Sequence, residues 1–210
     1  MLYLTEDAYI ASGYSRTTYH HPHYSHLCVK IVNGGEFRKV HKHRQKRDVK
    51  FLQKLQRRGK HLEGIPYYFG EVETNLGVGY VYEKVTDYDG QVSQTLAELL
   101  SSYDGKTDRE GAVLDAIRAL GQLVYREKII VHDKLPDGNV LCRKNSDESY
   151  TLFVIDGIGD TVLIPVLNYL PHVLKKRVVK RWIKYLVNPV LERHNWIVSS
   201  DLSLCDKALG

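Results

Sequence analysis

The chain has 210 residues, a length that suits one domain built as two lobes. Hydrophobic residues make up 43% of it, so a sizeable core is expected. The formal charge of +5 favours phosphate-bearing ligands but is too mild to predict a nucleic-acid partner. The three separated cysteines form no CxxC pair, so neither a zinc knuckle nor a disulfide scaffold is supported, and a reducing compartment fits best.

The N-terminal segment shows no basic stretch followed by an apolar run, and the longest apolar stretch is far shorter than a membrane span. We therefore expect no signal peptide, no transmembrane segment and a cytoplasmic location.

The first part of the chain predicts strands arranged around one long helix. Tyr9–Gly13 and His26–Val32 are typical of strands, and the second carries a single lysine among apolar residues. The polar stretch 36–59 has apolar residues at helical spacing and ends at a glycine. Aromatic and β-branched residues predict two further strands at 67–72 and 79–85, with a turn between them.

The character of the sequence changes near Asp87–Gly90. Thr95, with Glu98 three residues later, predicts a capping box at a helix start, and 109–127 shows the clearest helical spacing. Short strands are expected at 129–132, 140–143 and 152–156, followed by a helical, basic region from about residue 163. This order predicts an α+β fold in one domain, residues 1–210, with a sheet-rich N-lobe (1–86) and a helical C-lobe (87–210).

Lys30 lies in a strand that otherwise reads as buried, where an ammonium group needs a carboxylate or phosphate partner. The alternative is an edge strand with Lys30 in water. Upstream, the loop from Ser12 to Arg16 could drape over phosphates, with Gly13 allowing close backbone approach, although an ordinary hairpin fits as well. Asp48 on the long helix could reach Lys30, or it could be exposed among its many lysines.

Two later segments offer further groups for a ligand. The strand around Glu83 and Val85 leads out of the sheet region, and its backbone N–H and C=O groups could pair with an adenine edge. Asn139 and Asp156 each offer side-chain oxygens to a divalent metal ion. Both also sit beside glycines, and asparagine or aspartate with glycine is typical of turns.

Together, and in this order, these pieces match the protein-kinase plan of glycine loop, strand lysine, helix carboxylate, connector, catalytic loop and metal aspartate. The sequence resembles the bacterial YrbL family of PhoP regulatory network proteins over nearly its whole length. The segments that carry the resemblance are SGYSRTTYHHP, LCVKIV, GIPYYFGEVET, GVGYVYE, DYDG, NVLC and IDGIGDTVLIP. The resemblance implies a protein-kinase-like fold and does not by itself imply activity.

The catalytic loop departs from the kinase pattern. Kinases place an aspartate five residues before the asparagine, and here that position is Lys134, whereas Asp133 is six residues before Asn139. Loss of such a base typically costs about 10² to 10⁴ in rate. A backbone bulge would bring Asp133 into the catalytic position, while a regular loop would leave Lys134 there. The regular loop is favoured because it needs no rearrangement.

The sequence therefore predicts a protein that binds ATP and Mg²⁺. In this interpretation Gly13, Arg16, Lys30 and Asp48 serve the phosphates, and Glu83 and Val85 serve adenine. Asn139 and Asp156 hold the metal, with Asp133 or Lys134 in the catalytic position. The acceptor would be a protein, a sugar or a lipid-linked sugar. The alternative is a pseudokinase-type regulatory protein in a PhoP-linked bacterial stress response.

Two further features have competing interpretations. The cluster His20–His26 could bind a transition metal, but a polar hairpin tip is favoured. The basic runs 39–47 and 175–184 could meet lipid or nucleic acid, but helices with one packed face and one solvated basic face are favoured.

Overall fold

The computed structural model describes residues 1–59, 61–102, 109–131, 135, 138–159 and 171–193. By their internal contacts these residues divide into two compact units, Met1–Thr86 and Asp87–Gly210. The division falls at the segment where the character of the sequence changes. Each unit is described by itself below.

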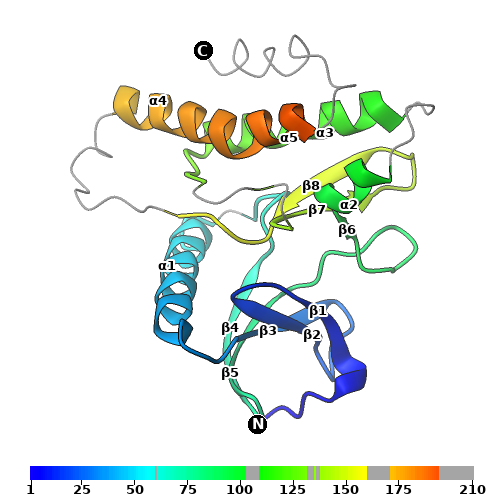
Figure 1. Cartoon of the computed structure of the whole chain (residues 1–210), viewed down its shortest axis with the longest axis vertical. Coiled ribbons are helices and arrows are strands. Elements are labelled where there is room, and N and C mark those ends of the chain that lie inside the picture. The colour runs from blue at the N-terminus through cyan, green and yellow to red at the C-terminus, as the bar shows by residue number, and fades with distance from the viewer. Residues whose placement is uncertain (60, 103–108, 132–134, 136–137, 160–170, 194–210) are drawn as a thin grey trace. The chain divides into compact units, whose positions relative to one another are not determined.

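The N-terminal unit is built on a five-stranded antiparallel sheet (Figure 1). Its order is β1-β2-β3-β5-β4, so β3 is the middle strand. A short 3₁₀ turn, Glu6–Ala8, precedes the sheet. The strands are β1 (Tyr9–Ser12), β2 (Arg16–His20), β3 (Leu27–Val32), β4 (Tyr68–Thr74) and β5 (Gly77–Glu83). Gly77, with a φ of 106°, closes the turn between β4 and β5 in a conformation that favours glycine.

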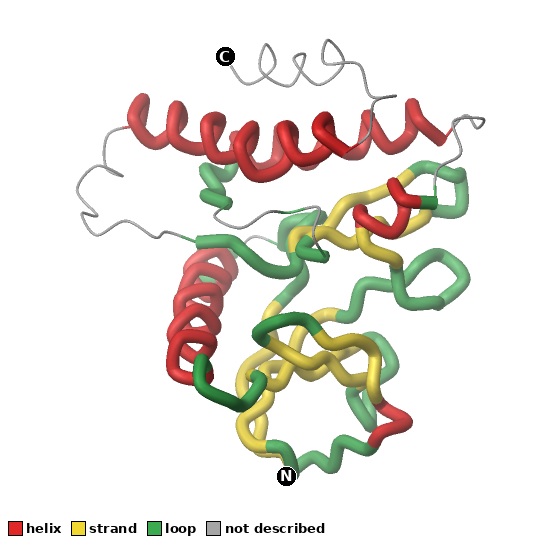
Figure 2. Tube along the Cα trace, in the orientation of Figure 1, coloured by secondary structure: helices red, strands yellow, loops and turns green. Residues whose placement is uncertain are grey.

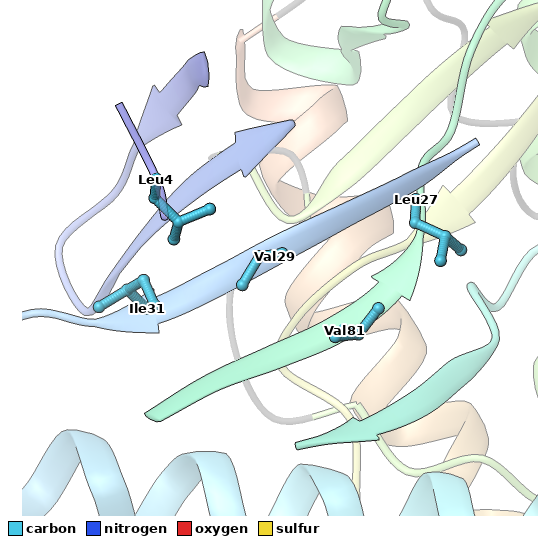
Figure 3. Close-up of a cluster of buried hydrophobic side chains, with 5 residues drawn as sticks. All are labelled: Leu4, Leu27, Val29, Ile31 and Val81. Carbon is cyan, nitrogen blue, oxygen red and sulfur yellow. The ribbon is translucent and has the colours of Figure 1, made fainter. Parts of the chain in front are cut away.

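One face of this sheet carries the apolar core of the unit. Side chains alternate between the two faces of a strand, so Leu27, Val29 and Ile31 of β3 share a face. They form a buried cluster with Val81 of β5 and with Leu4 from the segment before β1 (Figure 3). Cys28, Lys30 and Val32 of the same strand point to the opposite face, and they too are buried.

Helix α1 (Arg38–Gln56) packs against β3 and β4. Its buried residues recur at helical spacing, but their chemistry changes along the helix. The second half buries Val49, Leu52 and Leu55, whereas the first half buries polar side chains. The residues that α1 turns toward the sheet are His41, Gln45, Asp48, Val49, Leu52 and Leu55.

The C-terminal unit contains a small antiparallel sheet of order β6-β7-β8. Its strands are β6 (Gln94–Thr95), β7 (Val140–Lys144) and β8 (Tyr150–Val154). Helix α2 (Leu96–Ser101) begins with the expected capping box: the Thr95 hydroxyl accepts the Glu98 N–H, and the Glu98 carboxylate accepts the Thr95 N–H. The turn at Asp87 is fixed to this sheet because its carboxylate accepts hydrogen bonds from Ser93 and from the Lys144 N–H.

Most of the other described residues of this unit are helical (Figure 2). α3 (Arg109–Arg126) contacts β8 and α4 (Pro171–Trp182). A π-helical stretch, Ile183–Val187, joins α4 to α5 (Asn188–Arg193). α3 and α4 approach closely because Gly121 lies against the indole of Trp182, where an added Cβ would lie 3.2 Å from the ring.

The structure confirms an α+β fold with a sheet-rich N-terminal unit and a mostly helical C-terminal unit. The expected strand at 129–132 is wrong for the part that is described. Ile129, Ile130 and Val131 are buried, but only Val131 forms a bridge, to Ile158. This short apolar run is therefore buried as irregular backbone, which periodicity does not distinguish from a strand. Among the described residues no helix is long and apolar enough to cross a membrane.

Candidate functional site

Lys30 lies on the middle strand of the N-terminal sheet, and only 8% of its surface is exposed. The neighbouring strands supply Thr18 and Tyr80 as its direct cross-strand partners. Its ammonium lies over the Tyr82 ring, 4.9 Å from the centroid, an arrangement in which the ring face attracts the cation. The exposed-edge alternative for Lys30 is therefore wrong.

Asp48 forms a buried ion pair with Arg16, the first residue of β2. The Arg16 guanidinium donates to Asp48 Oδ2 at 2.9 Å, and the two side chains are 7% and 5% exposed. Arg47 donates to the other oxygen at 3.3 Å from a half-buried position. The alternative of an exposed Asp48 is wrong. The sequence anticipated Lys30 as its partner and did not anticipate Arg16.

The polar residues of α1 continue this buried network. Gln45, which is 0% exposed, donates a hydrogen bond of 2.6 Å from Nε2 to the Tyr82 hydroxyl. Burial raises the pKa of Tyr82, because it disfavours the charged phenolate. One turn earlier His41 is also buried, and its ring packs nearly perpendicular to that of Tyr14, with 5.1 Å between the two ring centroids. The Lys30 face of the sheet therefore carries a layer of buried polar groups.

The loop between β1 and β2 is a tight hairpin. The Gly13 N–H donates to the Arg16 carbonyl at 2.8 Å, and the hydroxyls of Ser12 and Thr17 pair across the turn. Asn33, the residue after β3, fixes this loop: its side-chain amide donates to the Gly13 carbonyl at 2.9 Å. The same side chain accepts the Thr17 hydroxyl at 2.8 Å. The hairpin interpretation thus describes the geometry of the loop, and β2 delivers Arg16 to the sheet face of Lys30.

The connector after β5 already uses part of its backbone. The Glu83 N–H donates to the Tyr67 carbonyl and the Lys84 N–H to the His26 carbonyl, both at 2.8 Å. The Glu83 carboxylate accepts the Tyr67 N–H at 3.1 Å. Val85, two residues further, is buried. Any adenine contact through an N–H at this connector therefore has to use a residue other than Glu83 and Lys84.

In the C-terminal unit, Asn139 and Asp156 lie at the same end of the β7–β8 hairpin. Asn139 precedes β7, Asp156 follows β8, and the Ile155 N–H donates to the Asn139 carbonyl at 3.0 Å. Both residues are partly buried. One Asp156 oxygen accepts the Gly157 N–H at 2.7 Å. Gly138 adopts a φ of 94°, a conformation that favours glycine just before Asn139.

Asp133 and Lys134 lie outside the described residues, so the structure does not decide between the bulged and the regular catalytic loop. Within the described part of the chain, no group of three or more histidine, cysteine, aspartate or glutamate side chains is arranged to hold a metal ion. The histidine-rich hairpin agrees with its polar-tip interpretation. There His21 Nδ1 accepts the N–H groups of His23 and Tyr24, and burial together with the neighbouring His23 and His26 lowers the pKa of His21.

Sequence reasoning missed Tyr82, Gln45 and Asn33. Gln45 could have been found, because His41, Gln45, Asp48 and Leu52 follow one another at the spacing of a single helix face. Tyr82 lies two residues from Tyr80 on β5 and shares the sheet face that holds Lys30. Asn33 gave no signal beyond that of a turn former.

The described residues therefore define an α+β protein whose sheet-rich unit buries a lysine beside an arginine–aspartate pair. The chain belongs to the family of the PhoP regulatory network protein YrbL, whose model matches residues 2–189. It is similar to the YrbL proteins of Escherichia coli (strain K12) and Shigella flexneri, each 30% identical over 195 residues and covering 91% of this chain and 89% of the relative.

A crystal structure of a kinase domain matches with a TM-score of 0.49 and 15% identity, covering 73% of this chain and 51% of the other. The chain thus spans about half the length of that protein.

Proposed function

We propose that this chain is a protein-kinase-like protein that binds ATP with Mg²⁺. Lys30 and Arg16 bind phosphate oxygens, and Asp48 holds the cations in place. The backbone near Glu83 and Val85 binds adenine. Asn139 and Asp156 hold the metal ion, and Gly13 lets the loop approach the phosphates.

The buried Lys30 is the observation that carries the proposal. Taking an ammonium group out of water is costly unless charged or hydrogen-bonding partners surround it. Here a lysine on the middle strand faces a helix that buries an aspartate. Kinases hold the α- and β-phosphates with a strand lysine that is followed in the chain by a helix carboxylate. The buried Arg16 adds a planar donor suited to phosphate oxygens.

The donor set in the C-terminal unit fits Mg²⁺. This ion prefers oxygen ligands and is usually bound through one or two carboxylates together with substrate phosphates. Asp156 supplies a carboxylate and Asn139 an amide oxygen, and the hairpin end holds both. When bound, Mg²⁺ would neutralise phosphate charge.

Calorimetry and thermal unfolding with ATP and Mg²⁺ test this proposal. We expect micromolar to millimolar affinity, and ligand at ten times Kd should stabilise the fold by about 1.4 kcal/mol. Lys30→Met and Asp156→Asn should each weaken binding tenfold or more, whereas Lys180→Met, at an exposed site, should not. Absence of heat together with an unchanged Tm at millimolar ATP would reject the proposal.

A regulatory protein that binds nucleotide without transferring phosphate is the second candidate. Lys134 favours it, because a charged lysine five residues before Asn139 cannot accept a proton from a substrate hydroxyl. The family description, a PhoP regulatory network protein, agrees with a regulatory role.

Phosphate release by wild type, Asp133→Asn and Lys134→Ala separates the two candidates. Activity that Asp133→Asn abolishes and Lys134→Ala preserves identifies an enzyme with a displaced base. Nucleotide binding without turnover in any of the three proteins supports the regulatory candidate.

A further inference from the structure

A third of the lysines and arginines of this protein lie in one helical segment. Residues 38–58, which span α1 and its end, contain ten lysines and arginines and one acidic residue, Asp48. The rest of the N-terminal unit and the whole C-terminal unit each contain more acidic than basic residues. The formal charge of +5 therefore understates the local charge on this helix.

The outer face of α1 is a line of basic side chains, which we call the basic stripe. Its members follow one another by three or four residues and are all exposed: Lys39, His43, Lys46, Lys50, Lys54 and Arg57. The single carboxylate of the helix, Asp48, points the other way and is paired with Arg16. Within the described residues, none of the stripe lysines has a carboxylate partner.

This arrangement is unfavourable for the isolated protein. Like charges at i and i+4, such as Lys46 and Lys50, repel each other and destabilise a helix. A solvated face would normally mix both signs of charge, because interspersed Glu and Lys stabilise a helix at the same spacing. The absence of acidic residues from the stripe is therefore better explained by an anionic partner than by folding.

We infer that the basic stripe binds the phosphate backbone of a nucleic acid. A line of cations about 28 Å long, from 19 residues at about 1.5 Å each, complements a linear polyanion. That length spans about eight phosphates at about 3.4 Å per nucleotide. The mild net charge argued against such a partner, but the distribution of the charge argues for it.

Two other anionic partners fit this face less well. Protein interfaces are depleted in lysine, which is the main component of the stripe. A membrane-surface helix inserts its apolar face, but Val49, Leu52 and Leu55 are already buried against the sheet.

An exposed aromatic pair lies at the start of the same helix. Phe37 is the residue before α1 and is 51% exposed, and Tyr14 from the β1–β2 loop is 73% exposed. Their ring centroids lie 6.4 Å apart. Proteins that bind single-stranded nucleic acids stack the bases on exposed aromatic rings that lie beside cationic side chains. Binding should therefore be stronger for a single strand than for a duplex, with little dependence on sequence.

Fluorescence anisotropy with a labelled single-stranded 20-mer tests the inference. We expect log K to fall linearly with log[salt] with a slope of about −3 to −4, as five or so contacts to a single strand would give. Lys46→Gln/Lys50→Gln should weaken binding at least tenfold and flatten the slope, without lowering the Tm. Lys30→Met should leave this binding unchanged, which separates it from nucleotide binding.

The matched control is Lys176→Gln/Lys180→Gln, which removes two exposed lysines at the same spacing from α4. Equal losses in the two double variants would show that net charge alone attracts the oligonucleotide, and would overturn the inference. It would also be overturned if the wild type bound vesicles containing phosphatidylglycerol, in a way that depends on Lys46 and Lys50, but did not bind the 20-mer.

Discussion

Different kinds of interaction stabilise the two faces of the N-terminal sheet, although the same strands form both faces. On one face Leu4, Val29, Ile31 and Val81 bury apolar surface, a stabilisation that is proportional to area and has no preferred direction. On the other face Lys30, Arg16 and Tyr82 meet the polar half of α1. Each of those groups depends on a particular partner at a particular distance.

The difference indicates which face carries residues that folding alone does not require. A buried ion pair is often no more stabilising than well-packed apolar residues of the same volume, because both charges lose their hydration. The opposite face of the same sheet is packed with such apolar residues. The polar layer is therefore the better candidate for function, and breaking each face should have a different signature.

The largest effect is expected from removing the buried carboxylate. Asp48→Ala leaves the Arg16 guanidinium buried without the partner that accepts at 2.9 Å, which should cost about 3 to 5 kcal/mol. The matched control is Asp115→Ala, since Asp115 forms an exposed pair with Arg118 at 2.7 Å. That change should cost about 0.5 kcal/mol or less, because water screens exposed pairs.

Urea unfolding followed by circular dichroism measures both variants. Hydrogen exchange in peptides from β3 and α1 then shows whether the N-terminal unit carries the loss. Similar losses in the free energy of unfolding for Asp48→Ala and Asp115→Ala would show that the buried pair contributes no more to stability than the exposed pair.

A smaller effect is expected on the apolar face. An added Cβ at Gly79 would lie 2.6 Å from Val29 Cγ1, closer than two carbons can approach, so the cluster must shift. Gly79→Ala should therefore cost about 1 to 3 kcal/mol through overpacking. Nothing lies within 4 Å of a Cβ at Gly34, so Gly34→Ala should be near neutral. Nucleotide binding should survive in both variants, and a loss of binding in Gly79→Ala would contradict a separation between the two faces.

Periodicity in the sequence predicted most of the fold. The alternating run around Val29, the capping box at Thr95 and the regular spacing of 109–127 each follow from local geometry that the sequence records directly. The run 129–131 was wrong, because buried irregular backbone and a buried strand have the same composition.

The candidate site was predictable as a set of residues rather than as a set of contacts. Lys30 stood out as a charge in a segment that reads as buried, and Asp48 as the helix carboxylate that could reach it; both are buried. The pairing of Asp48 with Arg16 depends on the register of β2 against β3 and on the rotation of α1, and no local pattern encodes either. The role of Tyr82 depends on the same cross-strand register.

The smallest effect is expected from Tyr82→Phe, because the ring and the hydroxyl of Tyr82 serve different neighbours. Tyr82→Phe keeps the ring beneath the Lys30 ammonium but removes the hydroxyl that accepts from Gln45 at 2.6 Å. It should cost about 1 kcal/mol, the net value of one buried hydrogen bond. Tyr82→Leu removes the ring as well, and the lost attraction for the cation should add about 0.5 to 2 kcal/mol.

Urea unfolding gives the stabilities of both Tyr82 variants, and calorimetry with ATP and Mg²⁺ shows whether the ring also orients Lys30. We expect Tyr82→Phe to keep wild-type affinity and Tyr82→Leu to lose several-fold. Equal affinities in the two variants would show that Asp48 and the sheet hold Lys30 in position without the ring.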